Sequence, residues 1–84
     1  MGTKNNPGQF DCYANALPDE PVFVLLARDP QFYDLVTRWA KHRGQMINCG
    51  ERPQSDSPMV SEAMRCAGDG ATWRRDNNGI WRNR

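Results

Sequence analysis

The clearest pattern of apolar positions follows Asp29 and Pro30, which suit a helix cap and a first helical residue. Apolar side chains then recur at mostly helical spacing, at Phe32, Leu35, Val36, Trp39, Ala40, Met46 and Ile47. This period places them on one face of a helix, while Asp34 and Arg38, four residues apart, are expected to pair on the other. The run from Asn48 to Gly50 supplies a stop, so the pattern predicts a long amphipathic helix.

A second start of the same kind stands at Ser57 and Pro58. Apolar residues follow at helical spacing, at Met59, Val60, Ala63, Met64, Ala67 and Trp73. Gly68 and Gly70 interrupt this pattern, and each costs about 1 kcal/mol relative to Ala inside a helix. The sequence therefore leaves two alternatives, a helix that breaks near these glycines and a continuous one that runs to about Asp76.

The stretch 19–27, DEPVFVLLA, is short, apolar and ambiguous. The acidic residues and the proline that open it suit the first turn of a helix, and Arg28 would complement the helix dipole at the other end. The rival is a strand, because valine and phenylalanine favour β-structure and a short apolar run has no diagnostic period. A lone strand has no obvious partner elsewhere in the sequence, so we predict a short helix.

The ends of the chain have a different composition. Residues 1–18 are rich in Gly, Asn and Pro and read as an irregular arm, whose Phe10, Tyr13 and Leu17 could lie across a core. Residues 77–84 read as a tail rich in Arg and Trp that packs on a helical domain formed by residues 19–76. The predicted fold class is mainly α, a small helical hairpin or three-helix arrangement with irregular N- and C-terminal arms.

Large apolar side chains at these positions are the expected core. We assign to it Leu25, Leu26, Phe32, Leu35, Val36, Trp39, Met64 and Trp73. Trp39 stands at the centre of the longest pattern, so Trp39→Ala is expected to unfold the protein at a cost of roughly 3–5 kcal/mol.

Composition makes this core thin. Only 13 of the 84 residues are Leu, Ile, Val or Phe, below the roughly 20% at which disorder becomes an option, but the net charge is only +1. Trp and Met are therefore expected to complete the core. No apolar run approaches the roughly 20 residues that cross a bilayer, and the first residues lack a signal-peptide pattern. We expect a cytoplasmic protein without a membrane partner.

Residues able to carry catalysis are not gathered by the sequence. The three cysteines, Cys12, Cys49 and Cys66, form no CxxC pair and fit neither a disulfide framework nor a zinc site, so reduced thiols are expected. His42 lies among basic neighbours, without a carboxylate to orient it. We predict no catalytic residues, no metal and no cofactor.

Arginine and tryptophan gather near the C-terminus, where the last twelve residues hold four of the nine arginines and two of the three tryptophans. These residue types are enriched in protein-binding hot spots and also contact nucleic acid. The predicted binding residues are Arg38, Lys41, Arg43, Arg74, Arg75, Trp81 and Arg82. A net charge of only +1 makes nucleic acid the less favoured partner.

The run DEPVFVLLARDP, together with the later Trp39-Ala40 pair, resembles a family of short, largely uncharacterised proteins of tailed bacteriophages and prophages of proteobacteria. The likeness extends from about Tyr13 to Arg82. It implies no reaction or cofactor. Phage proteins of this size often act as accessory factors that bind a host protein or a defence complex, which implies action in the bacterial cytoplasm.

The leading expectation is therefore a small phage-type accessory protein, not an enzyme, that binds a macromolecular partner such as a host or host-defence protein. One alternative is a nucleic-acid or nucleotide binder that uses the basic faces. Another is a self-associating structural protein whose copies share a core.

Overall fold

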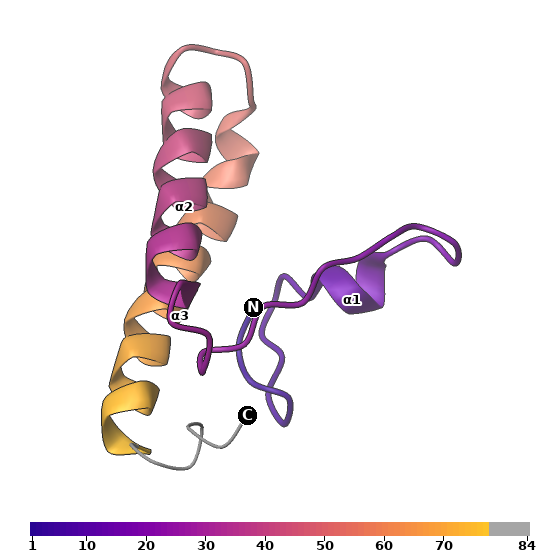
Figure 1. Ribbon diagram of the computed structural model, residues 1–84. Coiled ribbons are helices and arrows are strands. Elements are labelled where there is room, and N and C mark those ends of the chain that lie inside the picture. Colours follow the sequence, from indigo (N-terminus) through magenta and orange to yellow (C-terminus); the bar gives the residue numbers. More distant parts are fainter. Residues whose placement is uncertain (78–84) are drawn as a thin grey trace.

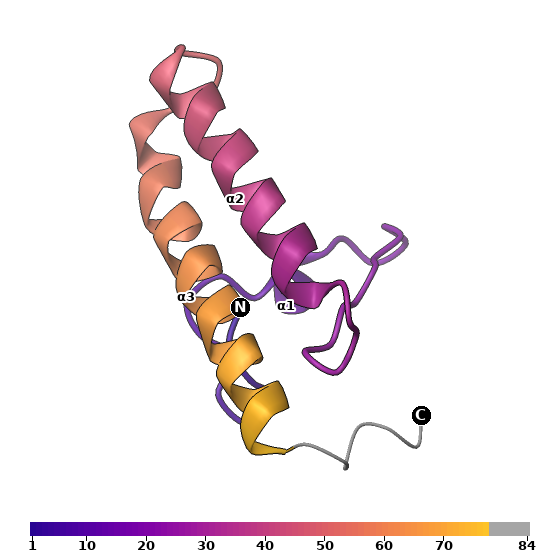
Figure 2. The ribbon, with the colours of Figure 1, turned by 60° about the vertical axis from the view of Figure 1, so that its left-hand side comes forward.

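A helical hairpin forms the body of the protein in the computed structural model, which describes residues 1–77. Helix α2 spans Phe32–Asn48 and helix α3 spans Ser57–Asp76, joined by a loop that contains the short 3₁₀ helix η1, Gln54–Asp56. The two long helices lie side by side and antiparallel, and the N-terminal arm, with the single turn α1 at Cys12–Asn15, projects from one side (Figures 1 and 2). The prediction of a mainly α fold with an irregular N-terminal arm is confirmed, whereas residues 78–84 of the predicted C-terminal tail lie outside the described residues.

The predicted stop of the first long helix is also confirmed. Helix α2 ends at Asn48, and the N–H of Cys49 donates to the carbonyl of Gln45 at 3.0 Å. Gly50 takes a φ of +87°, a left-handed conformation that glycine adopts without a steric cost. The chain can therefore reverse towards η1 directly after the last turn.

The helix starts differ from the prediction by a residue or two. Asp29 does not cap α2, because its carboxylate accepts from the N–H of Gln31 at 2.8 Å and closes a separate turn before the helix. Ser57 is the first residue of α3, and its hydroxyl donates to Gln54 Oε1 at 3.4 Å. In both places an extra turn precedes the long helix.

Small residues fill the seam between α2 and α3. The buried residues are Phe32, Thr37, Ala40 and Ile47 on α2, and Ala63, Ala67 and Gly70 on α3. Four of these seven residues are alanine or glycine, and such short side chains let two helix backbones approach closely. Thr37 is accommodated there because its hydroxyl donates to carbonyls of its own helix, those of Tyr33 and Asp34, at 2.8 and 3.0 Å.

Gly70 gives this seam its closest contact. A Cβ atom at Gly70 would lie only 2.3 Å from the Phe32 ring, so the ring packs directly on the glycine backbone. At Gly68 an added Cβ would meet nothing within 4 Å. Helix α3 is continuous through both glycines to Asp76, which decides between the two alternatives that the sequence leaves open.

Much of the predicted core is wrong. Phe32 is buried and Leu25 and Val36 are half-buried, but the five other residues are exposed: Leu26, Leu35, Trp39, Met64 and Trp73. The seam is narrow because its residues are small, and the larger side chains flank it instead of filling it. Trp39 keeps 39% of its surface exposed, so its removal should cost less than the 3–5 kcal/mol typical of a buried aromatic side chain.

The helix predicted at 19–27 is also wrong. Residues 21–26 are extended, between a turn in which the Glu20 N–H donates to the Leu17 carbonyl and one in which the Asp29 N–H donates to the Leu26 carbonyl. The β-forming character of Val22 to Val24 outweighs the helix signals at the ends of the run. The strand alternative is not borne out either, because residues 1–77 contain no strand.

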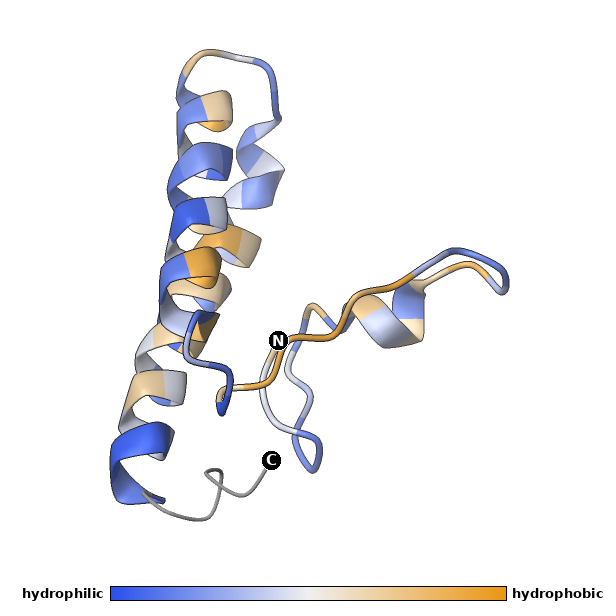
Figure 3. Cartoon of the chain, in the orientation of Figure 1, coloured by the Kyte–Doolittle hydropathy of each residue, from blue (hydrophilic) through white to orange (hydrophobic). Residues whose placement is uncertain are grey.

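The arm does not use its large side chains to cover the hairpin. Asp11 caps α1 by accepting from the N–H groups of Tyr13 and Ala14, and Tyr13 and Leu17 are exposed. Figure 3 shows the apolar run that follows crossing back from the tip of the arm towards the hairpin. The expectation that Tyr13 and Leu17 lie across the core is wrong.

Replacing the two glycines of α3 should separate helix propensity from packing. Gly68→Ala is expected to stabilise the protein by about 1 kcal/mol, because it removes a flexible residue and meets no neighbour. Gly70→Ala is expected to destabilise it by about 1–3 kcal/mol, because the new methyl group overlaps the buried Phe32 ring. Urea denaturation followed by circular dichroism measures both changes.

The overlap between the new methyl group at position 70 and the Phe32 ring can also be relieved by a smaller residue at position 32. Adding Phe32→Leu to Gly70→Ala should cost less than the sum of the two single changes, because the ring that clashes is gone. Strict additivity, or equal stabilisation by both glycine replacements, would contradict the packing described here.

Candidate protein-interaction surface

One side of α2 carries a stripe of side chains that lies outside the seam with α3. Leu35, Trp39, His42 and Met46 follow one another at intervals of four, three and four residues, which aligns them along one side of the helix. Leu35, Trp39 and His42 are exposed, and Met46 is half-buried. We call these four residues the α2 stripe.

Trp39 is held in place at the centre of this stripe. The guanidinium of Arg43 lies 5.1 Å from the centre of the Trp39 ring, within the range of a cation–π contact. Arg43 is fixed in turn by Asp56, whose Oδ2 lies 3.2 Å from Arg43 Nη1 and 2.7 Å from Arg52 Nε. The hydrogen bond from Arg52, supported by that from Arg43, lowers the pKa of Asp56. The indole therefore has an ordered support that reaches the loop between the helices.

The predicted binding residues have mostly local partners. Arg38 pairs with Asp34 at 3.3 Å, as the spacing predicts, and Arg75 pairs with Asp76 at the same distance. Lys41 is exposed on α2, whereas Arg43 belongs to the support of Trp39. Trp81 and Arg82, like Ile80, lie outside the described residues.

Arg74 has a structural role that the sequence does not reveal. Its Nη1 donates to the carbonyls of Arg28 and Ala27, at 2.6 and 3.4 Å, and so joins the last turns of α3 to the turn that precedes α2. Arg74 is half-buried in this position. We therefore assign it to the attachment of the arm and not to a binding surface.

Glu62 forms a second attachment between arm and hairpin. Its carboxylate accepts from the N–H groups of Gln9 and Phe10, at 3.1 and 3.2 Å, and lies 3.5 Å from the amino group of Met1. Desolvation alone would raise the pKa of Glu62, but the two backbone donors and the ammonium group outweigh it and hold the pKa below its usual value. The arm is thus bound to α3 through a charged group.

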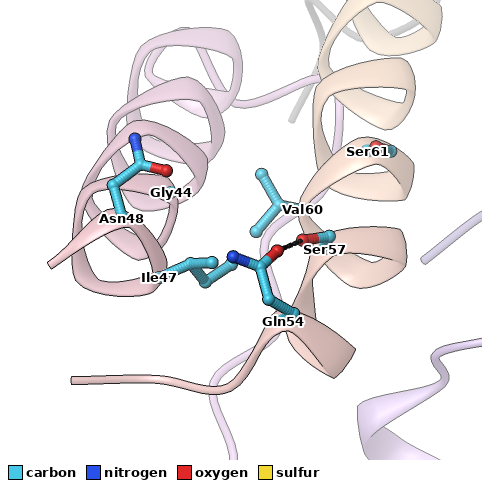
Figure 4. A pocket seen from close by; sticks show the side chains of 7 residues that line it. All are labelled: Gly44, Ile47, Asn48, Gln54, Ser57, Val60 and Ser61. Atoms are coloured by element: carbon cyan, nitrogen blue, oxygen red, sulfur yellow. Dashed lines mark hydrogen bonds between the residues drawn. The ribbon is translucent and has the colours of Figure 1, made fainter. Parts of the chain in front are cut away.

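A shallow depression of about 230 Å³ lies at the loop end of the hairpin (Figure 4). It is lined by Gly44, Ile47, Asn48, Gln54, Ser57, Val60 and Ser61. None of these side chains is titratable near neutral pH, so the serine hydroxyls have no general base in the depression. The depression offers weak polar contacts and no arrangement for nucleophilic chemistry.

Other chemistry-bearing side chains are dispersed. Cys12 and Cys49 are exposed and Cys66 is half-buried, all three as free thiols. In the part of the chain that the structure describes, no three His, Cys, Asp or Glu side chains gather to hold a metal ion. No helix in residues 1–77 has the length and apolar character needed to span a membrane.

The sequence pattern marks Trp39 as important because it predicts that this side chain is buried. Its helical spacing with other apolar residues predicts burial, and the structure places it beside the seam. The overlooked signal is residue size, because Ala40 on one helix and Ala63, Ala67 and Gly70, at intervals of four and three on the other, are buried where the two faces meet. The largest residues next to such faces remain on the surface.

Acidification should release the arm from α3. A carboxylate whose pKa is lowered on folding contributes stability above its unfolded pKa, near 4.5, and loses that contribution as the pH falls through the folded pKa. The amide chemical shifts of Gln9 and Phe10 should therefore change together in this acidic window. Glu62→Gln should show the released shifts at neutral pH, whereas Glu51→Gln, on an exposed side chain, should not. Unchanged Gln9 and Phe10 shifts in Glu62→Gln would contradict this attachment.

Comparison with known proteins gives no relative from which a role could be transferred. No protein-family model, curated protein or solved structure matches the chain.

Proposed function

We propose that this protein acts by binding another protein through the α2 stripe. The observation that carries the proposal is Trp39, which is partly exposed on a long helix and braced by Arg43 and Asp56. Tryptophan and arginine dominate protein-binding hot spots, because a large flat side chain that is already ordered buries much area at little entropic cost. The stripe offers such an anchor with apolar neighbours.

The chemistry of the stripe specifies the partner surface. An apolar groove would receive Leu35, Trp39 and Met46, which stand at i, i+4 and i+11 on one side of the helix, as amphipathic helices are commonly bound through their apolar side. The basic side chain of Lys41, exposed on the same helix, favours an acidic group on the partner surface. The resemblance to short phage and prophage proteins favours a partner from a bacterial host, including a defence protein.

Nucleic acid is the weaker alternative. Affinity for nucleic acid comes mainly from cations that neutralise phosphates. Arg38, Arg43 and Arg75 each already have a carboxylate partner, and Arg74 binds backbone carbonyls. A phosphate backbone would have to compete with these contacts.

The experiment compares two tryptophans of equal exposure. Trp39 and Trp73 each have 39% of their surface exposed, but only Trp39 belongs to the α2 stripe. Immobilised protein is used to capture partners from a bacterial lysate treated with nuclease, and the affinity of a captured protein is then measured for both alanine variants. Trp39→Ala should weaken binding roughly 30-fold, the loss of about 2 kcal/mol expected for a hot-spot residue, while Trp73→Ala should retain it.

Three outcomes would contradict the proposal. One is equal loss of binding in both variants, another is full retention in Trp39→Ala, and the third is capture that nuclease abolishes. Circular dichroism checks that Trp39→Ala remains folded. Leu35→Ser provides a second variant of the stripe with the same expected direction.

A further inference from the structure

Residues 20–26 form the most exposed apolar segment of the arm. Val22, Phe23 and Val24 have 51%, 86% and 65% of their surface exposed. The segment contains no helix, and within residues 1–77 the backbone N–H groups of residues 22–25 and the C=O groups of residues 21–25 have no hydrogen-bond partner. An extended apolar run with unpaired backbone groups is a template for pairing with another chain.

We propose that residues 22–26 pair with the same residues of a second copy of this chain. The two segments run antiparallel about a two-fold axis that passes through Val24. This self-association uses the arm and is independent of the α2 stripe.

The charges beside the run favour a second copy arranged in this way. Glu20 and Arg28 each stand four residues from Val24, so antiparallel pairing brings Glu20 of each copy towards Arg28 of the other. Glu20 Oε1 accepts from the Leu17 N–H at 3.0 Å, which holds the carboxylate at the start of the run. Asp29 accepts from the Gln31 N–H and forms no ion pair with Arg28 within residues 1–77. A parallel arrangement would bring like charges together.

The apolar side chains are also complementary to themselves. In this register Val22 lies opposite Leu26, Phe23 lies opposite Leu25, and Val24 lies opposite its own copy. Aromatic–aliphatic and branched aliphatic pairs of this kind stabilise antiparallel strands. The exposed side chains of both copies are then covered by each other.

Pro21 limits the assembly to two copies. In this register Val22, Val24 and Leu26 direct their N–H and C=O groups to the other copy. The residues that alternate with them face the outer edge, and Pro21 is one of these. Its missing N–H therefore leaves no gap in the pairing. The Leu26 carbonyl already accepts from the Asp29 N–H and has a second lone pair for the other strand. On the outer edge Pro21 lacks the donor that a third strand would need, and a two-fold interface closes on itself.

Sedimentation of charge-swapped variants tests the pairing. Wild-type protein should show a monomer–dimer equilibrium as its concentration rises from micromolar to millimolar. Glu20→Arg and Arg28→Glu should each raise the dissociation constant roughly tenfold, because each puts two like-charge pairs in place of two attractive ones. The double variant should return to within about threefold of the wild-type value, although it too lacks the Glu20 carboxylate.

Disulfide trapping tests the register in a background with Cys12, Cys49 and Cys66 changed to serine. Directly paired residues have Cα atoms about 5.5 Å apart, within the range that a disulfide spans. Val24→Cys should therefore form covalent dimers on mild oxidation, and Val22→Cys should form them only when mixed with Leu26→Cys.

The following results of these experiments would contradict the proposal. The proposal is overturned if the protein is a monomer at every concentration or assembles beyond two copies. It is also overturned if the dimer persists in Val24→Lys. The register is wrong if Val22→Cys, without Leu26→Cys, is trapped as readily as Val24→Cys. Trp39→Ala should leave dimerisation unchanged, so failure of this proposal is distinguished from failure of partner binding by the α2 stripe.

Discussion

The close approach of α2 and α3 is the constraint on which the rest of the structure depends. It requires small residues along both facing surfaces, and at Gly70 it requires the absence of any side chain, because the ring of Phe32 occupies that space. Two helices of this length have little helical stability in isolation, so their packing supplies most of it. A chain with few large aliphatic residues obtains that packing from backbone and alanine contacts.

The same narrow seam determines what the protein presents to its surroundings. Because Ala40, Ala63 and Ala67 fill the space between the helices, Trp39 and Leu35 have no enclosed volume to enter. Their exposure follows from the packing of the hairpin and is not a defect at one position. Arg43 and Asp56 then convert a partly exposed indole into an ordered one. Stability and the proposed recognition thus rely on different residues of the same helix.

The two long helices could be predicted because their signals are local. Proline near each start, apolar spacing and the Asn48-to-Gly50 stop act within a few residues. Which apolar residues become buried could not be predicted from period alone, because the width of the seam depends on the sizes of residues on both helices. The sequence pattern therefore indicates that Trp39 is important but predicts it in the core. The same pattern indicates that Gly70 weakens α3, whereas Gly70 allows α3 to pack against Phe32.

The arm could not be predicted for a different reason. Its path depends on Arg74 and Glu62, which bind arm residues more than 45 positions away along the chain. At 19–27 the ends of the run favour a helix, whereas its middle favours β-structure. In the fold, a hydrogen-bonded turn on each side of the run leaves its middle without a helix. The candidate binding arginines were likewise recognised by composition, whereas their carboxylate and carbonyl partners are visible only in the fold.

The two attachments of the arm have a consequence for its entropy. Glu62 and Arg74 stand twelve positions apart on α3, about 18 Å along the helix axis, and they hold Phe10 and Ala27. The sixteen intervening residues form a closed loop, whose length-dependent closure entropy costs about 2.5 kcal/mol. The free energy of folding already includes this entropy loss. The segment therefore meets any other chain with its two ends already held, and association does not have to bear that part of the entropy loss.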